Sequence, residues 1–143
     1  MVFNLTKFID WPAWKIGDSG APFFVCFLGS DASTTRIQSL MTGKAVTGRT
    51  ISVHRLSKNE DGTSCHILYI AHAELKHFDE IAPALLKAAV LTVGDQDSFV
   101  AKGGIIGLPV VNDRIQIQIN LGSAQKSSLN VSSKLLRIAM VAK

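Results

Sequence analysis

Cysteine is scarce in this chain, and its two cysteines, Cys26 and Cys65, form no C-x-x-C unit. That unit is the minimal signature of thioredoxin-like redox sites and of zinc ribbons, so both classes are excluded. Long apolar runs are also absent. The longest run, residues 21–28, has eight residues, whereas a helix that spans a membrane needs about 20. We therefore expect no direct insertion into a membrane.

Charge of either sign is not concentrated anywhere along the chain. The 15 lysines and arginines exceed the 11 aspartates and glutamates, which gives a net charge of +4. Proteins that bind nucleic acid usually carry a basic stripe or patch with interleaved aromatic residues. A diffuse excess of this size is typical of a solvated surface, and we expect no nucleic-acid partner.

The common motifs of nucleotide binding and of nucleophilic catalysis are missing as well. Gly103-Gly104 is not followed by Lys-Ser/Thr as in a phosphate-binding loop, and neither G-x-G-x-x-G nor G-x-S-x-G occurs. A hydrolase would have to use His72 with Asp95 or Asp97, but loop solubility and helix capping explain these carboxylates more simply. Nothing in the sequence demands catalysis, and we expect no catalytic residue, no cofactor and no metal site.

Length and composition fit one folded domain over residues 1–143. The chain is 47% hydrophobic and 18% charged, which is too apolar for a disordered protein. A domain of this length buries a sizeable core without needing metals or many disulfides.

Hydrophobic spacing predicts an N-terminal helix and then alternating strands and helices. Apolar residues recur at helical intervals over residues 2–10, and Pro12 ends that helix, so residues 1–12 form the N-terminal element. Within residues 21–95, the predicted strands are 22–28, 51–55, 65–71 and 90–93, and the predicted helices are 30–43 and 77–88. Strands that are apolar on both faces are typical of a parallel sheet covered by helices.

The pattern changes in the last third of the chain. Two strands within residues 104–120 flank Asn112-Asp113, a two-residue link that tolerates positive φ and indicates an antiparallel hairpin. Residues 121–141 predict two helices, the second capped by Ser132-Ser133 and extending through Met140. The predicted fold is therefore α/β: a mostly parallel, roughly six-stranded sheet flanked by helices, with a C-terminal antiparallel hairpin and a final helix.

One candidate site is a crevice at the sheet edge. In open α/β sheets, ligands bind where the carboxyl ends of parallel strands meet. The candidates for lining this crevice are Gly29, Arg49, His72, Gly94 and Asp95. They would serve a small-molecule binding or sensor function.

Three aromatic residues near the N-terminus are candidates for a protein interface. They are Phe8, Trp11 and Trp14. Aromatic side chains are enriched among the residues that dominate interface energetics. The alternative, in which these rings pack the N-terminal element against the core, stays open at this point.

A series of short segments extends across nearly the whole chain. In order, these are KFIDWP at 7–12, FVCFLG at 24–29, GK at 43–44 with GR at 48–49, CHILYI at 65–70, VLTVGD at 90–95, GGII at 103–106, INL at 119–121 and SSKLL at 132–136. Together, in this order and with this spacing, they resemble the YfiR-like family of bacterial periplasmic proteins.

The resemblance implies a regulator and not an enzyme. The best-known relatives bind the periplasmic domain of an inner-membrane diguanylate cyclase and so lower cyclic di-GMP and biofilm formation. Related domains lie at the sensing end of some histidine kinases, which makes a sensor kinase the other candidate partner. The resemblance also implies an α/β domain that forms homodimers. A periplasmic small-molecule sensor is the alternative function.

Cys26 and Cys65 match cysteine positions of the family, which implies a disulfide between them and a role for redox state. Some relatives carry a second cysteine pair near the final hairpin, and this chain has none. Residues 1–11 lack the pattern of a signal peptide, so the residues alone leave open a cytosolic protein or a removed export signal. The resemblance implies the periplasm, and hence an export signal that has been removed.

Overall fold

A computed structural model gives the three-dimensional arrangement of the chain. It describes residues 8–16, 22–29, 45–46, 49–56, 62–71, 75–94, 99–108, 110–138 and 140–142. The helix predicted over 30–43 lies outside these residues.

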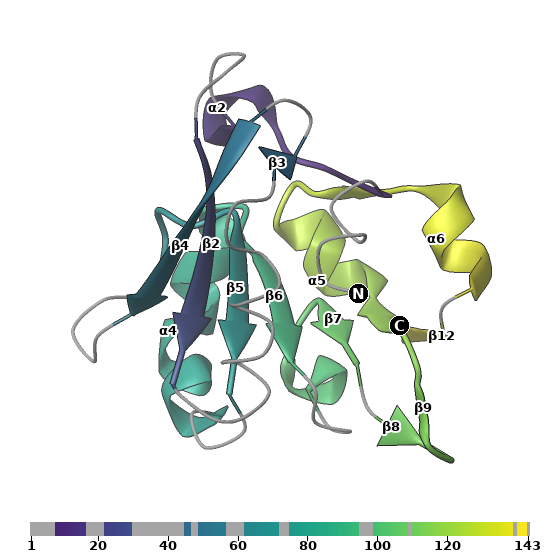
Figure 1. Ribbon diagram of the computed structural model, residues 1–143. Helices are drawn as coiled ribbons and strands as arrows, with labels where there is room; N and C mark the ends of the chain where they lie inside the picture. The colour runs from purple at the N-terminus through teal and green to yellow at the C-terminus, as the bar shows by residue number, and fades with distance from the viewer. Residues whose placement is uncertain are drawn as a thin grey trace.

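An eight-stranded sheet forms the centre of the molecule (Figure 1). Its strands, in spatial order, are β12 (Met140–Ala142), β10 (Gln118–Asn120), β7 (Ile106–Gly107), β6 (Leu91–Gly94), β5 (Ile67–Ile70), β2 (Phe23–Leu28), β4 (Arg49–Leu56) and β3 (Ala45–Val46). All neighbours are parallel except β10 with β7 and β4 with β3. The predicted mostly parallel sheet is confirmed, and its six main strands are flanked by the short edge strands β3 and β12.

The apolar runs form strands that are buried on both faces. All four residues of β5 and all four of β6 are buried. In β2 the side chains alternate between two separate cores. Phe23, Val25 and Phe27 face one core, and Cys26 and Leu28 face the other. The sequence predicts burial along the whole of β2, and this is wrong at Phe24, which is 37% exposed.

Helices and the N-terminal segment cover the two faces. Helix α4 (Leu75–Lys87) carries the chain from β5 to β6 and packs Phe78 and Leu85 into the core of one face. The other face is covered by residues of α5 (Leu121–Lys126) and α6 (Ser133–Ile138) together with Ile9 and Trp11. No helix among the described residues is both long and apolar enough to cross a membrane.

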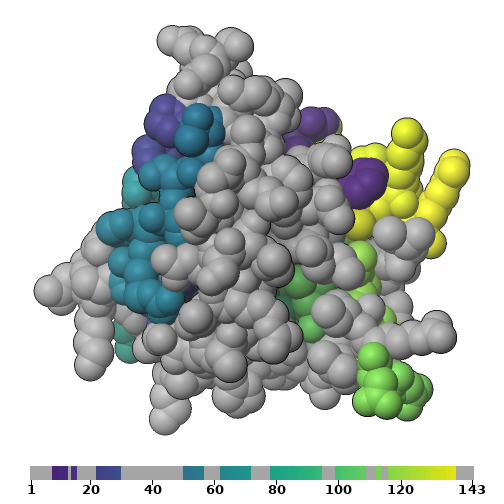
Figure 2. Space-filling view, in the orientation of Figure 1, coloured from purple at the N-terminus to yellow at the C-terminus, as the bar shows by residue number. Residues whose placement is uncertain are grey.

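The predicted hairpin is confirmed in two parts. Strands β7 and β10 pair antiparallel within the main sheet, with Ile106 opposite Ile119. Between them, β8 (Val110–Val111) and β9 (Arg114–Ile115) form a small separate ribbon. Its turn residues, Asn112 and Asp113, have φ values of 51° and 63°, as the favoured two-residue hairpin turn requires. The turn lies at the lower right edge of the molecular surface (Figure 2).

The predicted N-terminal helix is wrong at its C-terminal end. Ile9–Asp10 is a strand, β1, and it pairs antiparallel with β11 (Asn130–Val131). The Ser132 backbone N–H donates to the Phe8 carbonyl and extends this pairing. The local preference for a helix is outweighed here by the pairing of β1 with β11. In the strand, Ile9 is buried and Asp10 is exposed. A four-residue helix, α2 (Ala13–Ile16), follows Pro12.

The two predicted C-terminal helices are present but shorter. The Asn120 side chain caps α5 by accepting from the Ser123 N–H at 3.0 Å, and the Ser132 hydroxyl accepts from the Lys134 N–H at 3.2 Å. The extension of the last helix through Met140 is wrong, because Met140–Ala142 forms β12, parallel to β10. This pairing supplies hydrogen-bond partners for backbone groups of β10 that an edge strand would leave open.

Candidate partner-binding site

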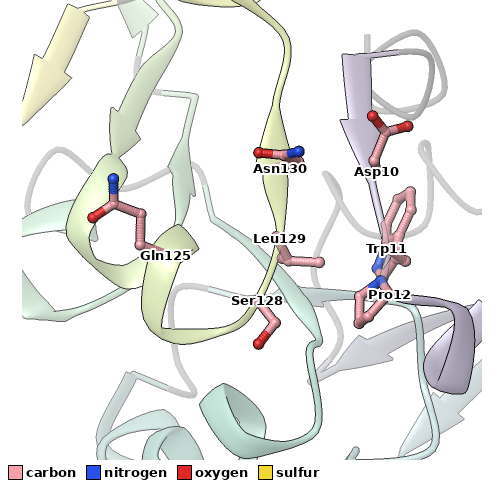
Figure 3. A pocket seen from close by; sticks show the side chains of 7 residues that line it. All are labelled: Asp10, Trp11, Pro12, Gln125, Ser128, Leu129 and Asn130. Atoms are coloured by element: carbon pink, nitrogen blue, oxygen red, sulfur yellow. The ribbon is translucent and has the colours of Figure 1, made fainter.

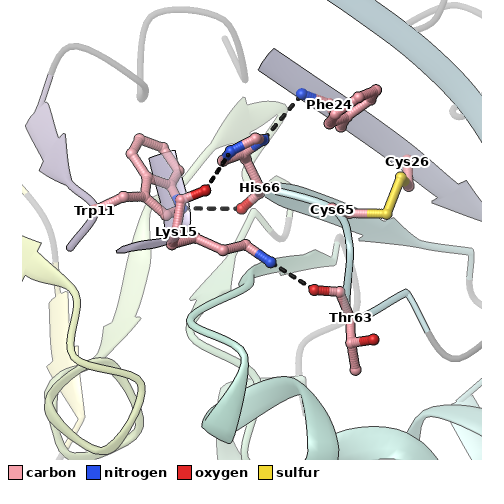
Figure 4. The surroundings of a disulfide bond; sticks show 7 residues. All are labelled: Trp11, Lys15, Phe24, Cys26, Thr63, Cys65 and His66. Carbon is pink, nitrogen blue, oxygen red and sulfur yellow. Dashed lines mark hydrogen bonds between the residues drawn. A yellow bond between two sulfur atoms is a disulfide. The ribbon is translucent and has the colours of Figure 1, made fainter. Parts of the chain in front are cut away.

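A disulfide links Cys26, in the middle of β2, with Cys65, just before β5 (Figure 4). Their Cα atoms are 6.1 Å apart, within the range that a disulfide bridges. Cys65 lies two residues before β5, whose first residue, Ile67, is opposite Val25, the chain neighbour of Cys26. Both cysteines are buried in the core that also holds Phe78 and Leu85 of α4.

His66 connects three parts of the chain beside the disulfide (Figure 4). Its Nδ1 accepts a hydrogen bond from the Phe24 backbone N–H at 2.9 Å, and its Nε2 lies 3.1 Å from the Lys15 carbonyl oxygen. A backbone N–H can only donate, so Nδ1 carries no proton, and Nε2 must be the donor to Lys15. The imidazole is therefore neutral and holds α2 against the start of β2.

Aromatic rings pack around this histidine. The Phe23 and His66 rings are stacked with centroids 4.7 Å apart, and Phe24 stacks on His66 at 5.9 Å. Trp11 meets Phe23 edge-to-face at 5.1 Å and donates from its indole Nε1 to the His66 carbonyl at 3.1 Å. The N-terminal segment is thus bound to the sheet through both rings and backbone.

Lys15 lies half-buried beside these rings. Its Nζ donates to the Thr63 carbonyl at 2.5 Å. Burial removes water from the ammonium group and lowers the pKa of Lys15 from 10.5 to about 8.

Two large apolar side chains are exposed among the described residues: Trp14, at 65%, and Phe24, at 37%. Trp14 belongs to α2, and Phe24 stacks on the histidine that binds α2. We call Trp14, Lys15 and Phe24 the amino-edge surface. Phe24 is the second residue of β2, and α2, which carries Trp14 and Lys15, is bound to His66 just before β5.

The three predicted interface aromatics occupy different environments. Trp14 is exposed, Trp11 is only 9% exposed, and Phe8 is partly buried against the core. Lys15, Phe24 and His66 are not among the residues that the sequence pattern predicted for a site. Phe24 is hidden within an apolar run, and nothing in the sequence marks Lys15 or His66, because their contacts reach across 48 and 42 positions.

The predicted crevice residues are divided between the two edges of the sheet. Gly29 follows β2 and Gly94 ends β6, so both lie at the carboxyl edge. Gly29 has a φ of 86° and accepts a hydrogen bond from Arg55 at its carbonyl. Arg49 begins β4, which runs parallel to β2, so its backbone lies at the amino edge, away from the two glycines. His72 and Asp95 lie outside the described residues.

A pocket of about 430 Å³ lies between the N-terminal segment and the C-terminal part of the chain (Figure 3). Leu129 points towards Trp11 and Pro12 across it (Figure 3). Its lining consists of Asp10, Trp11, Pro12, Gln125, Ser128, Leu129 and Asn130. The sequence did not predict this pocket, because it depends on the pairing of β1 with β11.

Comparison with solved structures shows the fold. A conserved domain protein from Vibrio cholerae O1 biovar El Tor is similar with a TM-score of 0.65 and 12% sequence identity, over 84% of this chain and 54% of that one. The ABC domain from Streptococcus pneumoniae, solved in complex with L-Trp, is similar with a TM-score of 0.60 and 11% identity, over 84% and 55%. This chain therefore spans about half the length of either structure.

Sequence comparison shows the family. No curated protein matches the chain. A match to the YfiR/HmsC-like family covers residues 1–140, which is nearly the whole sequence and includes both cysteines and every element described above except the last two residues of β12. The chain belongs to the YfiR/HmsC-like family, whose proteins are periplasmic and regulatory.

Proposed function

We propose that this chain is a periplasmic regulatory protein that binds the periplasmic domain of a membrane-bound diguanylate cyclase and restrains cyclic di-GMP signalling and biofilm formation. The observation that carries this proposal is the family match over residues 1–140. A membrane-bound sensor kinase is the other candidate partner, which would be bound through its periplasmic domain. The output of the protein is a contact with its partner and not a chemical reaction.

The disulfide supports the location. A bond between Cys26 and Cys65 persists in oxidising compartments and is rare in the cytosol. It also fixes the start of β5 to β2, the part of the fold that carries the amino-edge surface. We propose that an export signal directs the protein to the periplasm and is then removed.

We propose the amino-edge surface as the contact with the partner. A tryptophan that is 65% exposed on a short helix can insert into a partner, and such residues often dominate interface energies. Trp11 and Phe8 would support this surface from within, since their side chains lie against the core. The protein would act as a homodimer, as its family implies, and gel filtration with light scattering would test this.

The test is genetic. In the source bacterium, deletion of the gene should raise cellular cyclic di-GMP, and the wild-type gene should restore the low level. Trp14→Ala should fail to restore it although the protein accumulates normally, because Trp14 contributes little to the core. Lys134→Ala, an exposed substitution on α6, should restore it fully and serves as the control.

Two results would count against the proposal. An unchanged cyclic di-GMP level in the deletion strain would remove the regulatory function. Full restoration by Trp14→Ala would keep that function and remove Trp14 from the contact.

The sheet topology favours a second candidate, a small-molecule sensor. Strand order reverses between β2 and β5, where β4 lies to one side and β6 to the other. Doubly wound sheets bind ligands at the carboxyl ends of the strands at such a point, and Gly29 lies there. L-Tryptophan, which the similar streptococcal domain binds, is a first probe. A rise in melting temperature with ligand concentration would support this function, and a flat response would not.

A further inference from the structure

The ammonium group of Lys15 is partly removed from water, but among the described residues only one of its hydrogen-bond donors has a partner. Its ammonium group has three N–H donors, and one of them binds the Thr63 carbonyl. No carboxylate of the described residues lies within ion-pair distance of Nζ, and burial is the single cause of its lowered pKa. Two donors therefore remain available to an acceptor from outside this part of the chain.

The position of Lys15 is fixed from several sides. Its backbone N–H donates to the Pro12 carbonyl at 2.9 Å, and its carbonyl accepts from His66. Trp11, four residues earlier, is bound to the His66 carbonyl. A charged group that is held in place before binding loses little conformational freedom on binding, which favours affinity.

Two exposed aromatic rings belong to the segments that hold Lys15. Trp14 precedes Lys15 on α2, and Phe24 stacks on the imidazole that binds the Lys15 carbonyl. A partner side chain that reaches Nζ would therefore bring apolar neighbours against Trp14 and Phe24. Contact with these rings would exclude water and strengthen the charged interaction.

We propose that the amino-edge surface binds an acidic side chain of the protein partner, with the carboxylate on Lys15 Nζ and adjacent apolar residues on Trp14 and Phe24. This inference rests on the proposed regulatory function and specifies the chemistry of its contact. We infer a negative charge on the partner because Lys15 is positively charged. We infer apolar residues beside that charge because Trp14 and Phe24 are exposed.

Energetics favour a carboxylate over a neutral acceptor. Desolvation of both ions is the usual penalty of a buried ion pair. Folding has already removed part of the water around Lys15. A carboxylate that binds Nζ therefore forms an ion pair with it at a reduced desolvation cost. Removal of one member of such an interfacial pair typically weakens binding by tenfold or more.

Lys15→Met tests the inference because it removes the charge and keeps most of the aliphatic stem. In the strain described above, this variant should leave cyclic di-GMP at the level of the deletion strain, and Lys15→Glu should do the same. Lys102→Met changes an exposed lysine in the short 3-10 helix Val100–Lys102, outside the amino-edge surface, and should restore the low level. Immunoblots of periplasmic extracts establish that all variants accumulate equally.

A footprinting measurement on the wild-type chain covers the case in which a variant fails to accumulate. The purified protein is acetylated with a water-soluble N-hydroxysuccinimide ester, with and without inner-membrane vesicles that contain the cyclase. Mass spectrometry should show acetylation of Lys15 slowed about tenfold by these vesicles, and acetylation of Lys102 unchanged.

The outcomes separate the two proposals. Restoration by Lys15→Met, or unprotected Lys15 in the footprint, overturns the acidic contact and leaves the regulatory function standing. A deletion strain with unchanged cyclic di-GMP overturns both. Equal protection by vesicles of extracted lipid without protein overturns the acidic partner in favour of a membrane surface.

Discussion

The indole Nε1 of Trp11 donates a hydrogen bond of 3.1 Å to the carbonyl oxygen of His66, 55 positions further along the chain. In return, the His66 side chain binds the Lys15 carbonyl, so the two segments hold each other at two points. This reciprocal contact places the exposed Trp14 at the start of the central strands. It is therefore the link between the core and the proposed interface.

Trp11→Phe removes this hydrogen bond and keeps the aromatic packing on Phe23. The His66 carbonyl still accepts from the Leu91 N–H at 2.9 Å, so the loss should be modest, about 1 kcal/mol in the free energy of unfolding. Urea denaturation measures this change. Trp14→Phe is the matched control and should change stability by less than about 0.5 kcal/mol, because Trp14 is exposed. Equal effects of the two substitutions would contradict the structure.

Reduction of the disulfide should destabilise the protein strongly. The bond closes a loop with a sequence separation of 39, for which the chain-entropy estimate is about 4 kcal/mol. Urea titrations with and without a phosphine reductant measure the loss. In a Cys26→Ala/Cys65→Ala variant, the reductant should leave the urea midpoint unchanged. If the wild-type midpoint also stays unchanged, the bond has no role in stability.

Lys15 should make stability depend on alkaline pH. Its pKa is lower in the folded chain, about 8, than the ordinary 10.5, so the unfolded chain binds more protons between these values. Stability therefore rises with pH across this window, and the cost of the buried charge is fully present below pH 8. Solvent screening of a half-exposed group keeps the effect small.

The Lys15→Met variant isolates this contribution from that of other groups. The difference in unfolding free energy, wild type minus variant, should increase from pH 7 to pH 10.5. Urea unfolding at several pH values gives this difference. A difference that is flat with pH, or that falls, would mean that the Lys15 amine is fully hydrated.

The hairpin turn should respond in opposite directions to two substitutions at one position. Asp113 has a φ of 63°, in the left-handed region that glycine adopts freely and that aspartate, whose short polar side chain can hydrogen-bond locally, adopts more readily than alanine. We expect Asp113→Ala to lower the free energy of unfolding by about 1 kcal/mol, and Asp113→Gly to leave it unchanged or raise it. Thermal denaturation followed by circular dichroism distinguishes these results. A loss with glycine that exceeds the loss with alanine would be inconsistent with the turn.

Gly104 should not tolerate a side chain. A Cβ at this position would lie 2.2 Å from the ring of Phe99, which is fully buried and packs on Phe78 at 5.0 Å. We expect Gly104→Ala to destabilise by about 2–3 kcal/mol. Gly122→Ala in α5 is the control, since its Cβ would make only an ordinary contact at 3.5 Å. That control should be neutral or stabilising by up to about 1 kcal/mol, and the reverse order would refute this packing.

The amino-acid sequence determined the parts of the fold that depend on neighbouring residues. The apolar runs of β2, β5 and β6 require burial on both faces, which predicts a parallel sheet with helices on either side. The helical spacing of α4 and the Asn112-Asp113 turn are likewise local signals. The segments that resemble the family also predicted the pairing of Cys26 with Cys65.

Tertiary contacts decided the rest. The two residues of β1 and the three of β12 are too short to show a period, and each became a strand because a distant strand offered hydrogen-bond partners. The amino-edge surface arises in the same way. Trp14 and Lys15 are placed by the neutral side chain of His66, and Thr63 reaches Lys15 across 48 positions. Hydrophobic patterning predicts which residues become buried. Which of the buried residues contact one another depends on the register between strands, and only the folded chain sets that register.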